Sequence, residues 1–300
     1  MVVLLAMSSH SLNGFAQEPA IEKAIRESGA KVEIYKTTTN SKNEKVELNL
    51  YIFYPDGHQA TDQRPAIVFF FGGGWKGGKP TQFTNQCQYL ASRGMVAMTA
   101  DYRVSSRHGT KVKHCVSDAK SAVRWIRENA SKLGINPNQI ASGGGSAGGH
   151  IAACTGTLKQ YDEPTENKNI SSVPNAMVLF NPALVLAPLG DEAQRSKEKM
   201  SGMRDRAGVD PETISPVHHV SSGVPPTIVM HGKTDTTVPY ATAVAFEQAM
   251  KTAGNRCHLI GYEKQGHGFF NSGRKQGKYD DTVKEMDKFL VSVGFLKAKK

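Results

Sequence analysis

From residue 66 to the C-terminus, short apolar runs alternate with longer segments of helical periodicity. The first run, residues 66–71, is apolar throughout, which is typical of a strand buried on both faces of a sheet. Strands that alternate with helices of this length form βαβ units, with right-handed crossovers and mostly parallel sheets. Further strands are predicted at residues 95–100, 139–142, 176–180, 227–230 and 258–262, and helices at 81–93, 112–133, 147–158, 240–253 and 279–293. The pattern therefore predicts an α/β fold.

Two segments before this pattern predict an antiparallel hairpin at one edge of the sheet. Residues 31–36 have strand character, and in residues 46–54 apolar and polar side chains alternate. The sequence Tyr-Pro-Asp-Gly at residues 54–57 then predicts a turn.

The composition is that of an ordinary globular protein: 300 residues, 39% hydrophobic and 21% charged. A core of this size needs no disulfide or metal, and residues 17–300 are predicted to form a single domain. The net charge of +10 favours acidic partners in general. Lysine and arginine are scattered rather than gathered in a stripe with aromatic residues, which argues against nucleic-acid binding.

Residues 1–16 are predicted to be a signal peptide. Residues 2–7 form a short apolar run, and Gly14 and Ala16 place small residues where signal peptidase reads them. A basic segment before the run is missing, so a frayed tail or a weak helix is the alternative. No later stretch approaches the roughly 18 uninterrupted apolar residues of a membrane span. We therefore expect a secreted or periplasmic protein without a membrane span.

The four cysteines, Cys87, Cys115, Cys154 and Cys257, match no zinc-binding spacing. In an exported protein they allow one or two disulfides. We favour buried free thiols, because elements of regular periodicity surround all four.

Residues 184–222 interrupt the alternation, because they contain no buried-type strand. Residues 191–205 are charged and weakly helical, and prolines and glycines follow. Long insertions in compact domains are usually functional, so this segment is either a small cap over a functional site or a solvated surface excursion.

Residues 143–150 read Gly-Gly-Gly-Ser-Ala-Gly-Gly-His and lie between a predicted strand and a predicted helix. Within them, Gly144-x-Ser146-x-Gly148 has the pattern of a nucleophile elbow, a sharp strand-to-helix turn that exposes a serine. The residues two positions away must be small, because the backbone at the apex is strained and crowded. A phosphate-binding glycine loop is the alternative, but no lysine follows in the Walker pattern.

A second glycine run, residues 72–74, follows the first buried strand. Acyl transfer generates an oxyanion, which preorganised backbone N–H groups stabilise, and glycine lets the backbone approach the substrate closely. The predicted donors are the N–H groups of Gly73, Gly74 and Ala147. A plain tight turn is the alternative. The adjacent Trp75 is predicted to contact the substrate.

Two later loops supply an acid and a base. Asp235 lies a few residues after the strand predicted at 227–230, and His267 lies in a loop after the strand predicted at 258–262. With Ser146 as nucleophile, His267 is predicted to act as general base and Asp235 to orient it. The order Ser, Asp, His is one of the known chain orders of such a triad. Phe269, beside the histidine, is predicted to contact the substrate.

No metal-binding motif such as His-Glu-x-x-His occurs among the ten histidines, so no metal is expected. Asp101 and Asp118 are interpreted as members of structural ion pairs, and His218 and His219 as loop residues.

On these motifs the sequence resembles the esterase and lipase branch of the α/β-hydrolase superfamily. It is more closely similar to the acetyl-xylan-esterase-like and feruloyl-esterase-like carbohydrate esterases, over residues 31–296. The resemblance implies an eight-stranded, mostly parallel sheet with helices on both faces, an acyl-enzyme mechanism and no cofactor. Many relatives have histidine before the three glycines, where this chain has Phe71, so the bracing of that loop must differ.

The predicted function is therefore a carboxylic ester hydrolase that removes acetyl groups from a polysaccharide such as xylan. A feruloyl esterase and a short-chain esterase or lipase are the alternatives. A serine peptidase is disfavoured because the chain lacks a large extra domain, and a non-catalytic binding module because the triad is complete. The partner expected is an ester substrate, small or polymeric, and the oligomeric state stays open.

Overall fold

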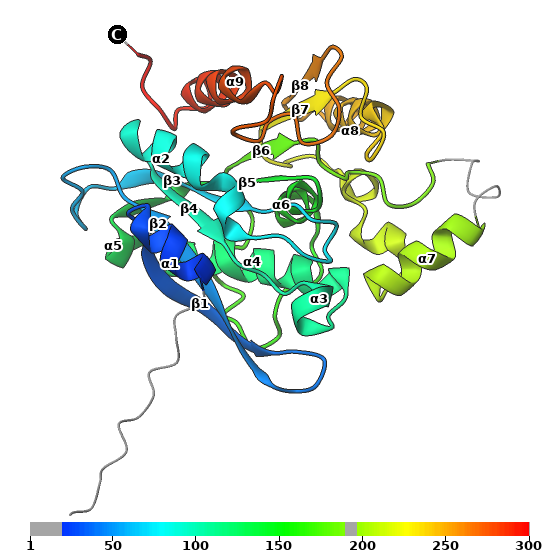
Figure 1. Cartoon of the computed structure of the whole chain (residues 1–300), viewed down its shortest axis with the longest axis horizontal. Helices are drawn as coiled ribbons and strands as arrows, with labels where there is room; N and C mark the ends of the chain where they lie inside the picture. Colours follow the sequence, from blue (N-terminus) through cyan, green and yellow to red (C-terminus); the bar gives the residue numbers. More distant parts are fainter. Residues whose placement is uncertain (1–19, 190–196, 300) are drawn as a thin grey trace, which may run out of the picture.

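A mixed eight-stranded sheet forms the centre of the protein, of which the computed structural model describes residues 20–189 and 197–299 (Figure 1). The strand order is β1-β2-β4-β3-β5-β6-β7-β8. In chain order the strands are β1 (Lys31–Thr39), β2 (Lys45–Phe53), β3 (Arg64–Phe70), β4 (Val96–Ala100), β5 (Ile135–Gly145), β6 (Ala176–Phe180), β7 (Thr227–Gly232) and β8 (Cys257–Tyr262). The predicted fold class is confirmed.

The N-terminal hairpin pairs β1 with β2 antiparallel, and β2 also pairs antiparallel with β4. All pairings from β4 through β3 and β5 to β8 are parallel. The carboxyl ends of β3, β5, β6, β7 and β8 therefore lie at one edge of the sheet, and the loops that leave them can meet there.

Helices cover both faces of the sheet (Figure 1). One core cluster joins the sheet to α4, α6 and α8, and the other joins it to α1, α2 and α9. The helices among the described residues are α1 (Ala20–Glu27), α2 (Thr84–Ser92), α3 (Ser105–His108), α4 (Val112–Glu128), α5 (Ala130–Leu133), α6 (Ala147–Thr157), α7 (Lys197–Ala207), α8 (Tyr240–Thr252) and α9 (Tyr279–Ser292), with 3₁₀ turns η1 (Pro80–Phe83), η3 (Pro211–Ile214) and η4 (Pro216–His219).

Strand β3 shows why the unbroken apolar run was informative. Val68 and Phe70 point into the cluster with α4 and α6, whereas Ile67 and Phe69 point into the cluster with α1 and α2. Successive side chains of a strand point to opposite faces, so a strand covered on both faces is apolar at every position.

Several local expectations differ from the structure. The single helix predicted at residues 112–133 is two helices, because the chain leaves the α4 geometry at Asn129 before α5 begins. Helix α1 has no counterpart among the predicted elements.

The predicted signal peptide, residues 1–16, lies outside the described residues. The described part of the chain contains no helix long and apolar enough to cross a membrane.

All four cysteines are buried free thiols, in agreement with the favoured prediction. Asp101 and Asp118 are held in ion pairs, by Arg107 at 2.7 Å and by Arg103 at 2.7 Å, as predicted.

The insertion at residues 184–222 is tied to the body of the protein at both of its described ends. The N–H of Val217 donates to the carbonyl of Leu184 at 3.1 Å, and the side chains of Leu184 and Ile214 are fully buried. Residues 190–196 lie outside the described residues, and α7, η3 and η4 follow them.

Candidate active site

Ser146 occupies the turn between β5 and α6, in a backbone conformation that L-residues rarely adopt. Its φ is 55° and its ψ is −118°. The N–H of Ser146 donates to the carbonyl of Phe180 on β6 at 2.9 Å, which fixes the turn against the neighbouring strand. Strain of this kind persists only where the surroundings hold it, and it presents the side chain above the sheet edge.

The two glycines of the elbow have no room for a side chain. A Cβ at Gly148 would lie 2.0 Å from the carbonyl oxygen of Phe70, and one at Gly144 would lie 2.5 Å from the carbonyl oxygen of Gly148. Both contacts are with backbone atoms, which cannot move aside without displacing β3 or α6. The motif spacing therefore reflects close packing of the nucleophile helix on β3.

The structure brings the three predicted triad residues together in hydrogen-bonding distance. His267 Nε2 lies 2.9 Å from Ser146 Oγ, and His267 Nδ1 lies 2.7 Å from Asp235 Oδ2. The Asp235 side chain is fully buried, whereas a quarter of the His267 side chain is exposed. These residues come from the loops after β5, β7 and β8, all at the carboxyl edge of the sheet.

The carboxylate of Asp235 is fixed by its own loop. Its Oδ1 accepts hydrogen bonds from the N–H groups of Thr237 and Val238, both at 2.9 Å. His231 Nε2 lies 2.8 Å from the carbonyl of Val238 and 3.3 Å from Asp235 Oδ2. Burial lowers the pKa of His231, which favours its neutral form. Asp235 Oδ2 is thereby held towards His267.

The loop that carries His267 is anchored by Asn181, which nothing in the sequence had marked. Asn181 follows β6, is fully buried and has a φ of 35°. Its Oδ1 accepts a hydrogen bond from the N–H of Gly268 at 2.9 Å. On the outer side of the loop, Arg274 donates to the carbonyl of His267. These contacts fix the position of the imidazole.

The predicted oxyanion loop lies beside the nucleophile. A Cβ at Gly72 would be 3.3 Å from the Cβ of Ser146. Gly73 and Gly74 have φ values of 127° and 62°, which glycine adopts without strain. Within the described part of the chain, the N–H groups of Gly73, Gly74 and Ala147 donate to no acceptor. All three predicted donors thus have free N–H groups, and Ala147 begins the helix that follows Ser146.

Phe71 precedes the glycine run, and an aromatic contact at this residue braces the loop. The ring of Phe71 stacks on that of Tyr102, with centroids 4.2 Å apart, and the Tyr102 hydroxyl donates to the Phe71 carbonyl at 2.7 Å. Gln82, on η1, accepts the N–H of Gly72 at 2.7 Å and donates to Asn271 at 2.9 Å. The same side chain thus links the oxyanion loop to the loop that follows His267.

Trp75 is mostly buried, and its indole links the oxyanion loop to the nucleophile helix. Its Nε1–H donates to His150 Nδ1 at 3.1 Å. His150 Nε2 in turn donates to the carbonyl of Ile214 in the insertion at 2.7 Å. Burial lowers the pKa of His150 to about 4, so the imidazole is neutral and can accept from the indole. Contact of Trp75 with a substrate stays a prediction.

The prediction that Phe269 contacts the substrate disagrees with its position. Its side chain is fully buried, and its ring packs against Tyr262 and Phe270 with centroids 4.8 and 6.3 Å away. Because the side chain points into the core beneath the His267 loop, it supports that loop from below.

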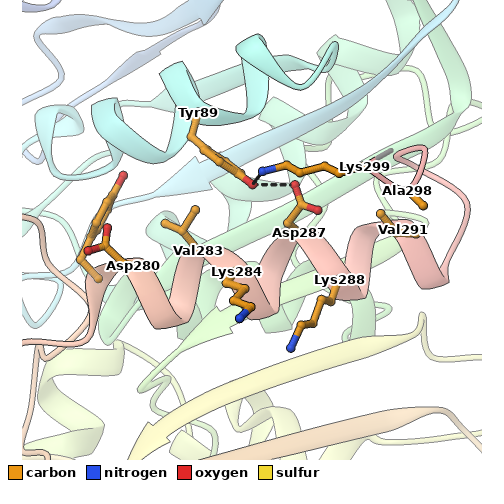
Figure 2. A pocket seen from close by; sticks show the side chains of 10 residues that line it. Tyr89, Asp280, Val283, Lys284, Asp287, Lys288, Val291, Ala298 and Lys299 are labelled. Carbon is orange, nitrogen blue, oxygen red and sulfur yellow. Dashed lines mark hydrogen bonds between the residues drawn. The ribbon is translucent and has the colours of Figure 1, made fainter.

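A separate cavity of about 660 Å³ lies between α2, α9 and the C-terminal residues 298–299 (Figure 2). Its walls include Tyr89, Val283 and Val291, and the Tyr89 hydroxyl donates to Asp287 at 2.7 Å. No residue of the triad or of the oxyanion loop lines this cavity.

Among the described residues, no group of three or more His, Cys, Asp or Glu side chains is arranged to hold a metal ion.

Comparison with protein families matches residues 50–250 to the BD-FAE family and residues 208–297 to the dienelactone hydrolase family. Among characterised proteins, esterase LipC of Mycobacterium tuberculosis is 28% identical over 70% of this chain and 54% of its own length. The acetylxylan esterase of Xylanibacter ruminicola is 29% identical over 76% of this chain and 45% of its own length. The chain thus spans about half the length of these relatives.

Solved structures match over almost the whole fold. The native thermophilic esterase 2 of Thermogutta terrifontis is 50% identical, with a TM-score of 0.85 over 90% of this chain and 95% of the other. The butyrate-bound form of the same protein gives a TM-score of 0.85 over 91% and 97%. With the match to residues 50–250, these similarities show that the chain belongs to the BD-FAE family of α/β-hydrolase esterases.

Proposed function

We propose that the protein is a carboxylic ester hydrolase that works through an acyl-enzyme. The observation that carries the proposal is the hydrogen-bonded line from Asp235 through His267 to Ser146, beside a loop with free N–H groups. A serine hydroxyl is a weak nucleophile at neutral pH, and an adjacent imidazole that takes its proton activates it.

The geometry supports two successive steps. Ser146 Oγ attacks the ester carbonyl carbon while His267 Nε2 takes the hydroxyl proton, and the N–H groups of Gly73, Gly74 and Ala147 stabilise the resulting oxyanion. The intermediate collapses as His267 gives the proton to the departing alcohol oxygen. Water then attacks the acyl-enzyme with His267 again as base, which releases the carboxylic acid and restores Ser146.

For the substrate, we favour an acetylated polysaccharide such as xylan. The acetylxylan esterase of Xylanibacter ruminicola supports this choice as a relative. The Thermogutta terrifontis esterase has been solved with bound propionate and with bound butyrate, which supports a short acyl group. The predicted signal peptide would bring the enzyme to a polymer outside the cytoplasm. A feruloyl ester or a short-chain alkyl ester is the alternative substrate.

The first test is hydrolysis of p-nitrophenyl acetate by the wild type and by Ser146→Ala. The expected result is turnover by the wild type and a loss of about 10³-fold or more in kcat for the variant, because the nucleophile is gone. Undiminished activity of Ser146→Ala would refute the assigned nucleophile.

Acetate release from acetylated xylan then tests the substrate. Release by the wild type but not by Ser146→Ala supports a polysaccharide deacetylase. Turnover of the aryl ester without acetate release from xylan would support the proposed esterase activity and refute the proposed polysaccharide substrate. A series of p-nitrophenyl esters with longer acyl chains separates a short-chain esterase from a lipase, since a lipase gains rate with chain length.

A further inference from the structure

The insertion reaches the oxyanion loop through one arginine at the C-terminal end of α7. Arg206 Nη2 donates to the carbonyl of Gly74 at 2.8 Å. The guanidinium carbon lies 5.3 Å from the centroid of the Trp75 ring. A cation held over an aromatic face has a restricted position, since the ring contact and the hydrogen bond act on it from different directions.

This guanidinium is charged, exposed and without a counter-ion among the described residues. Other arginines of the protein, Arg93, Arg103 and Arg124, are each held by carboxylates. Arg206 is held instead by a neutral carbonyl and a neutral ring, and one contact uses only one of its five N–H donors. It thus presents unused donors and an unneutralised charge to solvent.

Arg206 contacts a residue of the predicted oxyanion loop, which places its guanidinium near the ester that the loop would bind. Gly74 carries both the carbonyl that Arg206 binds and the N–H predicted to bind the oxyanion. The glycine run packs against Ser146, since a Cβ at Gly72 would lie 3.3 Å from the Cβ of Ser146. A substrate whose ester carbonyl occupies the oxyanion loop therefore has its neighbouring atoms close to the guanidinium.

We propose that Arg206 is a specificity-determining residue that binds a carboxylate in the alcohol part of the substrate. The preferred ester is accordingly an acyl group on an acidic, uronate-containing saccharide. This inference rests on the proposed esterase function, in which the acyl group is a plain acetyl and any charge must lie on the sugar. A guanidinium matches a carboxylate in planar, bidentate geometry, and charge-assisted hydrogen bonds of this kind are among the stronger ones.

The test uses two aryl acetates of similar size: 4-acetoxybenzoate carries a carboxylate, and 4-acetoxybenzamide carries a neutral amide. We expect the carboxylate-to-amide ratio of kcat/KM to be about five- to tenfold higher in the wild type than in Arg206→Gln, with the difference falling as salt screens the charge. The ratio in Arg206→Gln is the baseline, because it retains the difference between the two leaving groups. The ratio is the readout, because a shift of the oxyanion loop would slow both substrates alike.

Arg204→Gln is the matched control. Arg204 lies on the same helix, two positions away and therefore on a different side, where it pairs with Asp210 at 2.5 Å. The Arg204→Gln variant loses the same charge as Arg206→Gln and should keep the wild-type ratio of the two kcat/KM values. An equal loss in both variants would mean a general effect of net charge, and an unchanged ratio in Arg206→Gln would mean that Arg206 does not bind the carboxylate. Either result overturns the proposal.

A binding measurement separates this proposal from the proposed function. In Ser146→Ala, calorimetry with 4-acetoxybenzoate should give a Kd about five- to tenfold lower than with 4-acetoxybenzamide, and Ser146→Ala/Arg206→Gln should lose the difference. Equal Kd values in the single variant overturn the Arg206 proposal even if the enzyme hydrolyses esters. A difference in Ser146→Ala that disappears in Ser146→Ala/Arg206→Gln supports the Arg206 proposal even if xylan is not the substrate, and a difference that persists in the double variant overturns it.

Discussion

The carboxylate of Asp235 is bound by backbone N–H groups at one oxygen and by the imidazole of His267 at the other. The N–H groups of Thr237 and Val238 occupy Oδ1, so the carboxylate cannot rotate freely, and Oδ2 stays directed at His267. The acceptor on Nδ1 determines which imidazole nitrogen carries the proton, and only the tautomer with a free Nε2 lone pair can accept the proton of Ser146.

Asp235→Asn tests this arrangement. The amide can present its N–H to His267, which would place the proton on Nε2 and remove the base. We expect kcat on p-nitrophenyl acetate at pH 7 to fall by about 10³- to 10⁴-fold with KM little changed. Asp210→Asn, in an exposed cap outside the site, is the control and should retain wild-type activity. A kcat within tenfold of the wild type for Asp235→Asn would contradict the assigned role.

At this scale the sequence was informative where a residue type is required by backbone or chemistry. That Ser146, Asp235 and His267 lie together could be predicted, because the elbow needs glycines at fixed spacing and because a triad has a limited number of chain orders. Asn181 and Gln82 were missed, since an amide acquires its partner only when distant loops meet. Phe269 was misassigned because an aromatic residue beside a catalytic one can point to either side of its loop.

Among the elements, the predicted oxyanion loop is supported by side chains from four different segments. It is held by Tyr102 after β4, by Gln82 on η1, by Arg206 on α7 and by the pair of Trp75 with His150 on α6. The periodicity of the strands and helices could be predicted because each depends on local sequence. The bracing could not, because the indole and the imidazole that bind each other are 75 positions apart in the chain.

Trp75→Phe removes the indole donor and leaves His150 Nδ1 buried without a partner. An unsatisfied buried acceptor costs about 1–3 kcal/mol, so the free energy of unfolding should fall by that amount. We also expect kcat on p-nitrophenyl acetate to fall by about tenfold, because the loop that carries the oxyanion donors is less fixed. Trp125→Phe is the control, since Trp125 lies on α4 and its ring contacts Lys132 rather than the site. A Trp75→Phe variant that is destabilised but has an unchanged kcat would contradict this prediction, because the remaining contacts would then be enough to hold the oxyanion loop in place.

Over the whole molecule, buried and half-buried histidines make stability depend on pH. Burial is the largest cause that lowers the pKa of His150, to about 4 from an ordinary value of 6.5, and burial also lowers the pKa of His108, His114 and His231. Below about pH 6.5 these histidines bind protons in the unfolded chain, whereas in the folded protein they stay neutral to lower pH. Stability from this source is complete above about pH 6.5 and is lost as the pH falls towards 4.

The contribution of His150 can be measured on its own. Its shift corresponds to about 3 kcal/mol lost between pH 6.5 and 4. Urea unfolding across this range should show a shallower dependence on pH for His150→Gln than for the wild type, because glutamine retains a donor and an acceptor without titrating. His258→Gln, at an exposed position on β8, should keep the wild-type dependence. Identical dependence in His150→Gln and the wild type would disprove the assignment.

His267, the proposed catalytic base, follows β8, which lies at the edge of the sheet and pairs with β7 alone. Only Cys257 of that strand is buried, whereas every residue of β7 is. Edge elements with little buried surface open at a lower free energy than the interior of a sheet. Brief detachment of this margin would carry His267 away from a nucleophile that remains in place. The proposed hydrolysis therefore depends on an edge strand as well as on the central strands, and heating is expected to reduce activity before the central strands lose their pairing.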